Sequence, residues 1–254
     1  MKMFLISLAI AFALTLPKIG MLADFDVPGG AWLSLPASSL GYLLVFFHEI
    51  GHTAAFWFFG YPSIPTFDFE HGGGMTYAHA RSWLILGGLW ACAVMYGAHL
   101  WREEQYRLLA WLAGSVVLHG ILMLTGGDLV ITAFGGHAGE VLVAAFCMLR
   151  AFLGTTERSR GAAERWLNMV FGCFVLVYDT IFTAALMFSN AYRDDYAAQK
   201  GGHLAGDLDQ VALSLHIPMG AVAFFLMVFT LAVFAAVIYI GLRHGPYYDA
   251  EAQR

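Results

Sequence analysis

Charged residues are scarce in this 254-residue sequence, because Asp, Glu, Lys and Arg together make up only 12% of it. A soluble domain of ordinary composition carries roughly a quarter. Hydrophobic residues make up 59% of the chain, and they gather in long blocks. The sequence therefore predicts an integral membrane protein, with the lipid bilayer as its surroundings.

Two further shortages exclude classes of function. There are 13 Lys and Arg against 18 Asp and Glu, so the charge balance does not favour a nucleic acid as a partner. The three cysteines, Cys92, Cys147 and Cys173, stand singly in apolar stretches, without CxxC or secreted disulfide spacing. They predict small buried hydrophobic side chains.

Seven apolar segments approach the length of about 20 residues that a helix needs to cross a bilayer. They lie near residues 3–17, 39–60, 82–100, 107–125, 129–153, 166–190 and 217–242. The first resembles a signal-peptide core, but no small-x-small cleavage site follows it, so we expect a membrane anchor. With no visible repeat or linker, residues 1–254 predict a single integral membrane domain. Its expected fold class is all-α, a polytopic membrane helix bundle of six or seven transmembrane helices.

Basic residues distribute unevenly between the two sides that seven successive spans define. One side collects Lys18, Arg102, Arg107, Arg150, Arg158, Arg160, Arg165, Arg243 and Arg254, and the other only Lys2, Arg81, Arg193 and Lys200. Lys and Arg stay preferentially on the cytoplasmic side. We therefore expect the first side, which holds the C-terminus, to be cytoplasmic.

One apolar segment, the predicted helix at about 39–60, carries His48-Glu49-Ile50-Gly51-His52. Positions i and i+4 of a helix share a face, so His48 and His52 can bind one Zn²⁺ at about 2.0–2.1 Å. Glu49 can then lie beside a metal-activated water and accept its proton. Ionisable residues inside a membrane helix are costly, by a few kcal/mol even on insertion scales, which favours a functional interpretation over chance.

Zinc needs a third protein ligand. The candidates are Asp128, His137, Glu140, Asp179, Asp207 and Asp209. Asp128 begins a helix on the expected outer side, where Asp207 and Asp209 also lie in the polar stretch 191–216, so these acids can reach His52. His137 and Glu140 lie three residues apart and share a helix face. Asp179 is expected to orient a ligand, or to pair with His119 or His137.

The segment that follows the motif helix has features of a short β-hairpin. Gly60-Tyr61-Pro62 ends the helix. Residues 66–77 then alternate and turn through Gly72-Gly73-Gly74. We expect His71 and His79 on the solvent side, with reach into the cleft as an alternative for His71. An open β-edge beside a metal site can pair with an extended substrate segment, although a plain connecting loop fits the sequence equally well.

Three places in the sequence resemble the site-2-protease-like membrane zinc metallopeptidases, of the small bacterial peptidase-M50B-like type. They are HEIGHTAA at 48–55, the Gly60 turn with a strand and GGGMT at 72–76, and GDLDQVALSLHIP at 206–218. This resemblance implies a zinc-dependent endopeptidase of the bacterial inner membrane that cuts membrane proteins or peptides. It implies His48 and His52 as ligands and Glu49 as the general base.

For the third ligand, the resemblance favours Asp207. The Asp-Gly pair that better-known site-2 proteases use for this ligand is missing here, and Asp128, which follows a glycine, is the nearest substitute. Asp207 and Asp128 therefore both stay open.

Two other classes of function compete with the peptidase hypothesis. The first is a non-catalytic zincin-like membrane protein that serves as a metal-binding or accessory subunit of a membrane complex. The second uses the intramembrane His and acid residues for proton transport or haem binding. The sequence identifies neither a substrate nor a protein partner.

Overall fold

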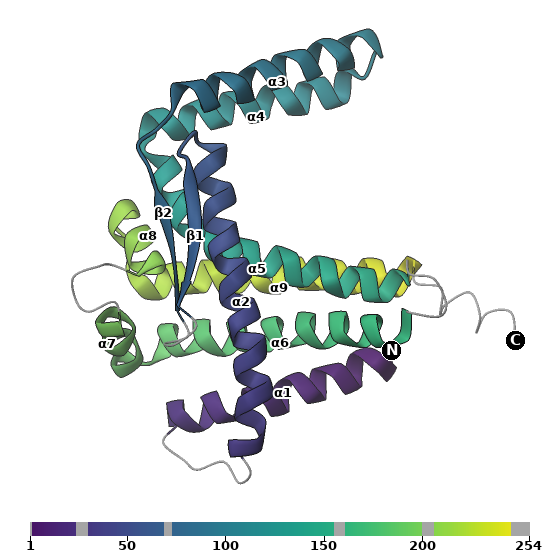
Figure 1. The fold of residues 1–254 in the computed structure, drawn as a ribbon, viewed down its shortest axis with the longest axis vertical. Helices are drawn as coiled ribbons and strands as arrows, with labels where there is room; N and C mark the ends of the chain where they lie inside the picture. Colours follow the sequence, from purple (N-terminus) through teal and green to yellow (C-terminus); the bar gives the residue numbers. More distant parts are fainter. Residues whose placement is uncertain (1, 24–29, 69–72, 155–160, 200–205, 245–254) are drawn as a thin grey trace, which may run out of the picture.

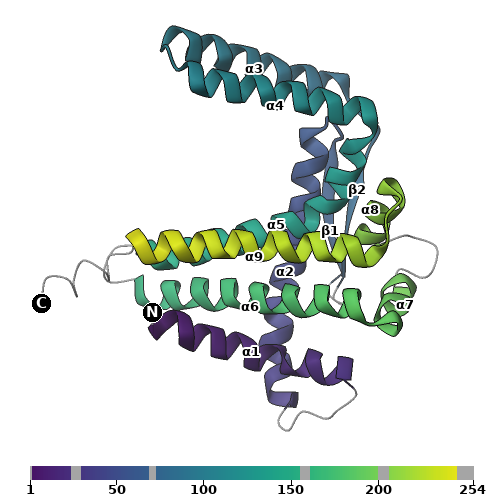
Figure 2. The same cartoon turned by 180° about the vertical axis from the view of Figure 1, so that it is seen from behind.

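A computed structural model describes residues 2–23, 30–68, 73–154, 161–199 and 206–244 (Figures 1 and 2). Within these residues the chain forms nine helices and one β-hairpin. The elements are α1 (Lys2–Ala23), α2 (Gly30–Phe58), β1 (Ser63–Asp68), β2 (Gly73–Ala78), α3 (Trp83–Arg102), α4 (Tyr106–Thr125), α5 (Gly127–Leu153), α6 (Gly161–Phe188), α7 (Asn190–Gln199), α8 (Asp207–Leu215) and α9 (Met219–His244).

Seven of the described helices are long and apolar enough to cross a membrane, as the sequence predicts. They are α1 to α6 and α9, so the all-α membrane bundle is confirmed as a fold class. Two details differ from expectation. Helix α2 begins at Gly30, well before residue 39, and accommodates Pro36 in its interior. The polar stretch 191–216 is also partly helical, since it contains most of α7 and all of α8. Both helices are too short to span a membrane.

Two helix ends that border the site have a glycine with a positive φ angle, a conformation that other residues avoid. Gly60 follows the last turn of α2 with φ +80°, and Gly126 joins α4 to α5 with φ +78°. At these φ angles a side chain would be strained, and glycine commonly ends helices for this reason. Gly126 thereby places Asp128 in the first turn of α5.

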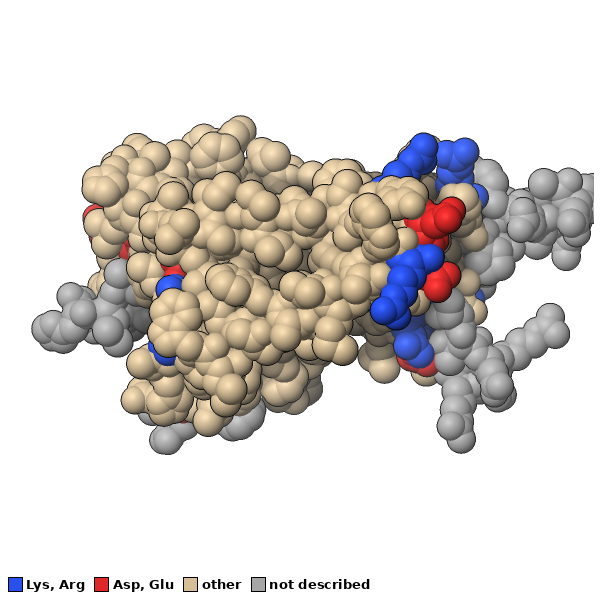
Figure 3. All heavy atoms as spheres, turned by 90° about the horizontal axis from the view of Figure 1, so that it is seen from above, with Lys and Arg blue, Asp and Glu red and all other residues tan. Residues whose placement is uncertain are grey.

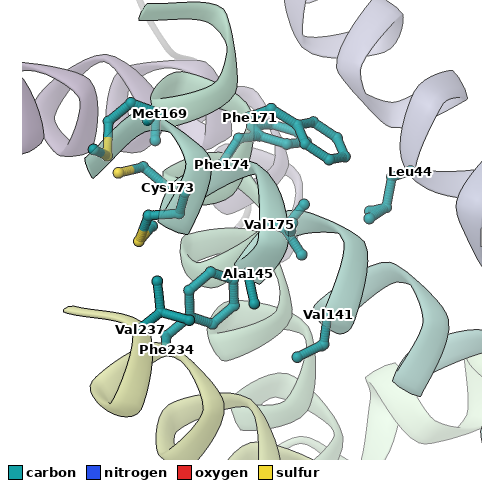
Figure 4. Close-up of a cluster of buried hydrophobic side chains, with 14 of the residues drawn as sticks. Leu44, Val141, Ala145, Met169, Phe171, Cys173, Phe174, Val175, Phe234 and Val237 are labelled. Carbon is teal, nitrogen blue, oxygen red and sulfur yellow. The ribbon is translucent and has the colours of Figure 1, made fainter. Parts of the chain in front are cut away.

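The hydrophobic core lies where α1, α2, α5, α6 and α9 meet (Figure 4). Leu44 of α2, Val141 and Ala145 of α5, Phe174 of α6 and Phe234 of α9 are all buried in it. Cys173 is buried there too, as predicted, and Cys147 is partly buried, but Cys92 is exposed on α3. The core thus fixes α5 and α6 against the helix that carries the zinc motif.

Figures 1 and 2 show α2 running crosswise to α1, α5, α6 and α9, whereas seven alternating spans would place it alongside them. Lys18, near the end of α1, donates a hydrogen bond to the Tyr178 hydroxyl of α6 (2.9 Å). Arg165 lies thirteen residues earlier in α6, which is roughly 20 Å along the helix axis. The prediction that Lys18 shares a side with Arg165 is therefore wrong, because α2 does not reverse the direction of the chain across the bundle.

The remaining basic residues of the larger set still gather at one end. The ends of α5 and α9 and the start of α6 lie close together there, and the turn between α3 and α4 lies on the same side of the molecule but apart from them (Figures 1 and 2). Arg150 of α5 pairs with Glu164 of α6 at 2.7 Å. Figure 3 shows the side of the molecule above the α3–α4 pair, with charged groups at both ends and a broad uncharged surface between them. Charged groups at two ends with an uncharged surface between them are typical of a membrane protein. Arg158, Arg160 and Arg254 lie outside the described residues.

The predicted hairpin is confirmed: β1 and β2 pair antiparallel from Ser63 with Ala78 to Asp68 with Gly73. The hairpin lies along α2. The Trp57 indole donates to the Ser63 carbonyl (2.9 Å), and Phe67 stacks on Phe46 with ring centroids 5.1 Å apart. These contacts hold the two strands beside the turn of α2 that carries His48, Glu49 and His52. His71 lies outside the described residues.

Candidate metal centre

His48 and His52 occupy one face of α2, as their spacing predicts, and their Nε2 atoms lie 3.0 Å apart. This face packs against α5 at its glycines. A Cβ added to Gly51 would come closer than 3.0 Å to the backbone of both Gly135 and Gly139. Small residues at helix contacts let two backbones approach closely. The two helices therefore meet without intervening side chains, and the His48 and His52 rings reach the surface of α5.

Gly136 of α5 lies directly against the two ring nitrogens. A Cβ at this position would come closer than 3.0 Å to Nε2 of both His48 and His52, a distance that Cβ atoms essentially never show. Only glycine at position 136 therefore lets α5 approach the paired nitrogens this closely.

Gly136→Ala should weaken zinc binding about 10–100-fold, the range that loss of an outer partner of a metal ligand costs. The reason is that the added methyl group displaces both imidazoles although every ligand atom is retained. Competition with a chromophoric chelator measures the change. Gly87→Ala in α3, where an added Cβ meets nothing within 4 Å, is the matched control. Equal affinity of Gly136→Ala and wild type would contradict this prediction.

Asp207, in the first turn of α8, completes a three-residue cluster with the two histidines. Its Oδ2 lies 3.0 Å from His48 Nε2 and 3.3 Å from His52 Nε2. Burial acts to raise the pKa of the Asp207 carboxyl, but hydrogen bonds and charge from His48 and His52, when these rings carry a proton toward it, outweigh burial and hold the pKa well below the usual range. The carboxylate form is the one that binds a metal.

Tyr196 of α7 fixes the start of α8, and hence the position of Asp207. Its hydroxyl accepts a hydrogen bond from the Leu208 amide (3.4 Å), and its ring leaves no room for a side chain at Gly206. The Asp209 carboxylate accepts from the Gly206 amide at 3.2 Å. Asp209 therefore caps the helix that presents Asp207 and is not a member of the cluster.

The hydrogen bonds at the Nδ1 atoms of His48 and His52 determine whether their Nε2 atoms carry lone pairs. The Thr132 carbonyl can only accept, so His52 donates to it from Nδ1 (2.7 Å). His48 Nδ1 faces Glu140 Oε2 at 3.3 Å, and an ionised carboxylate likewise only accepts. In the neutral rings both Nε2 atoms therefore carry lone pairs. With the Asp207 oxygen, three atoms that can each offer a lone pair converge, and either a shared proton or a metal ion can lie among them.

The spacing of these three atoms fits zinc. Ligand atoms about 2.0–2.1 Å from one tetrahedral Zn²⁺ lie about 3.3 Å from one another. The observed separations are 3.0 Å, 3.0 Å and 3.3 Å. Two neutral imidazoles and one carboxylate also match the ligand types that zinc takes in hydrolytic sites with an open fourth position. The donor set therefore suits a catalytic zinc ion, with Asp207 in the place of the third ligand.

Glu49 lies next to the cluster but belongs to a different set of contacts. Its Oε2 accepts a hydrogen bond from the Thr76 hydroxyl of β2 (2.7 Å), and only 5% of the residue is exposed. A Cβ on Gly74 would come closer than 3.0 Å to this carboxylate. Gly74 and Thr76 lie two residues apart and therefore on the same face of β2. This face of the hairpin covers Glu49 and holds its carboxylate in one orientation.

Asp128, the alternative third ligand, lies elsewhere. It is buried and forms an ion pair with Arg81, and it accepts a hydrogen bond from the Tyr61 hydroxyl at 2.9 Å. Tyr61 precedes the hairpin and Arg81 follows it, so Asp128 joins both ends of the hairpin to α5. The sequence places Asp128 on the same side of the membrane as His52, and this made it a candidate ligand. In the structure, however, its carboxylate is paired with the Arg81 guanidinium.

The remaining candidates lie behind His48, away from Asp207. His137 Nδ1 lies 2.6 Å from Glu140 Oε1, which confirms that these residues share a face of α5. Asp179 is buried in α6, and its Oδ2 has no hydrogen-bond partner among the described residues. It pairs with neither His119 nor His137, contrary to one expectation. His119 instead contacts the Phe58 carbonyl at the end of α2 (Nε2–O 3.0 Å).

Sequence reasoning missed Thr76, Gly136, Tyr196 and the Thr132 carbonyl. The glycines at 135, 136 and 139 carry a signal, because small residues at helical spacing mark close helix contacts in membranes. Thr76 lies in the GGGMT segment that carries the resemblance, but nothing in that segment indicates its contact with Glu49. Tyr196 and the Thr132 carbonyl carry no signal, since the fold alone brings them to the site.

Comparisons of the chain with known protein-family models, with curated proteins and with solved structures find no match.

Proposed function

We propose that this protein is a zinc-dependent endopeptidase that cuts peptide bonds within or beside a membrane. The observation that carries the proposal is the convergence of His48 Nε2, His52 Nε2 and Asp207 Oδ2 at distances of 3.0–3.3 Å, with Glu49 on the same helical turn. The resemblance of the 48–55, 72–76 and 206–218 segments to site-2-protease-like metallopeptidases supports the same function.

In this mechanism His48, His52 and Asp207 hold the metal, while Glu49 moves the proton. Zinc at a three-ligand site supplies a Lewis acid and lowers the pKa of a coordinated water to about 7. Glu49 accepts a proton from the attacking water and delivers it to the leaving amine. The Thr76 hydroxyl orients the Glu49 carboxylate, and the hairpin shields it from bulk water.

The hairpin also suggests how a substrate is held. A two-stranded sheet leaves one edge of each strand unpaired within the sheet. An extended substrate segment can add to such an edge by main-chain hydrogen bonds, which lipid cannot offer to an unwound helix. The predicted substrate is a membrane protein or peptide.

The basic helix ends suggest an orientation in the membrane. Arg102, Arg107, Arg150, Arg165 and Arg243 belong to helix ends on the same side of the molecule. By the positive-inside rule, this side of the molecule, with the C-terminal end of α9, faces the cytoplasm. The membrane in this proposal is the bacterial inner membrane. Asp207 belongs to α8, which leads into the start of α9, at the other end of that helix from Arg243.

Removal of the metal tests the proposal. The purified chain in detergent should contain about one zinc ion per molecule and should cleave labelled casein or a labelled apolar peptide of about 20 residues. Phenanthroline should abolish cleavage, and added Zn²⁺ should restore it, because water activation depends on the ion. Cleavage that persists after zinc loss would contradict the mechanism. Stoichiometric zinc without turnover of either probe would favour the non-catalytic accessory protein.

A further inference from the structure

Three ionisable residues are buried behind His48, on the side away from Asp207. They are His137 and Glu140 of α5 and Asp179 of α6, and all three are buried. Such residues are expensive inside membrane helices and generally have a role there. The proposed hydrolysis uses none of them directly.

Glu140 bridges two imidazole rings with its two carboxylate oxygens. Its Oε2 lies 3.3 Å from His48 Nδ1, and its Oε1 lies 2.6 Å from His137 Nδ1. His137 itself contacts two further rings, because it stacks on Phe182 with centroids 5.5 Å apart and meets the His48 ring nearly at right angles at 4.7 Å. The carboxylate is therefore held in place by a residue that does not belong to the three-atom cluster.

The same atoms also have the composition of a second metal site, since His48, His137 and Glu140 can offer ligand atoms within 4.8 Å of one another. His48 decides between the two sites. A neutral imidazole has one lone pair, so a cation bound at Nδ1 requires the proton to be on Nε2. That proton would remove His48 from the cluster with His52 and Asp207. One neutral His48 thus serves only one of the two sites.

The geometry points to Glu140, held by His137, as the positioning residue that selects the Nδ1–H form of His48 and so directs its Nε2 lone pair to the metal. This inference rests on the proposed zinc site. Outer carboxylate partners of metal-binding histidines fix the ring tautomer and orientation, and their loss costs about 10–100-fold in metal affinity. The Thr132 carbonyl performs the equivalent task for His52.

Asp179 allows the positioning effect of Glu140 to be separated from the effect of any buried acid behind His48. It is as deeply buried as Glu140, but no hydrogen bond joins it to His48 among the described contacts. If any buried acid in this region served, Asp179→Asn and Glu140→Gln should weaken zinc binding equally. If Glu140 acts by holding His48, only the change at Glu140 should matter.

The experiment measures the zinc dissociation constant by chelator competition on the full chain in detergent. Glu140→Ala should bind zinc about 10–100-fold more weakly than wild type, and Glu140→Gln, which keeps an acceptor oxygen, should lose less. His137→Phe, which keeps the ring stacking but not the hydrogen bond, should also lose less than Glu140→Ala. Asp179→Asn should match wild type. Thermal unfolding of each zinc-free variant checks that the fold is retained.

A second readout needs no metal. Nitrogen chemical shifts of histidine-labelled protein distinguish a protonated ring nitrogen from a bare one, and His48→Gln assigns the signals. The zinc-free wild type should show His48 protonated on Nδ1, and Glu140→Ala should move the proton partly to Nε2. An unchanged tautomer with unchanged zinc affinity in Glu140→Ala would overturn the positioning role, as would equal losses in Asp179→Asn and Glu140→Gln. A wild type that binds no zinc would instead overturn the proposed function.

Discussion

Glu49→Gln should lower the rate of peptide cleavage about 10²–10⁴-fold, the contribution that a positioned general base makes. The amide keeps the size of the side chain and can still accept from Thr76, which lies 2.7 Å from Glu49 Oε2. It cannot take a proton from water at neutral pH. The loss should therefore appear in kcat, while KM stays close to the wild-type value, because the substrate-binding edge of the hairpin is unchanged.

Zinc should stay bound to Glu49→Gln with wild-type affinity, since the Glu49 carboxylate contacts Thr76 and is not a member of the three-atom cluster. Elemental analysis of the purified variant measures this. The matched control is Glu164→Gln, the same chemical change at a glutamate that pairs with Arg150 at the basic end of the bundle. Glu164→Gln should cleave like wild type. A Glu49→Gln variant that retains full activity would refute the role of Glu49, and one that loses zinc would place Glu49 among the ligands.

The sequence predicts the helices well because a bilayer imposes one simple length on them. It also predicts that His48 and His52 share a face, since that depends only on helical spacing within a few residues. The hairpin at 63–78 follows from its alternation and glycines. These features are local, and the pattern that encodes each of them lies within the element itself.

The third member of the cluster is not local, and the residues alone do not single it out. Asp207 lies far along the chain from His48, and its approach depends on how α8 is seated beside Tyr196. Only the resemblance of the 206–218 segment favoured it. Asp128 was the alternative third ligand because it was expected on the same side of the membrane as His52. Nothing in the sequence indicates its contacts with Arg81 and Tyr61. Similarly, the crosswise path of α2 comes from packing, which hydropathy does not describe.

Asp207→Ala should abolish stoichiometric zinc binding, with a loss in affinity greater than the roughly 10–100-fold that removal of an outer partner costs. The change removes one of three ligand atoms and also the negative charge that offsets the ion. The two histidines then hold only two positions of a tetrahedral site. Elemental analysis and chelator competition measure the loss, and cleavage of casein should disappear with it.

Asp128→Ala is the informative counterpart, because both aspartates were candidates for the same ligand. It should retain wild-type zinc affinity while it loses about 1–3 kcal/mol of stability, less than a fully buried pair would cost since Arg81 is partly exposed. Limited proteolysis should show the loss as faster cleavage in the 63–78 hairpin, whose two ends Asp128 joins to α5. Zinc loss in a folded Asp128→Ala, with zinc retained in Asp207→Ala, would reverse the assignment. Retention in both variants would mean that another acid, with Glu140 and Asp179 next in order, supplies the third ligand.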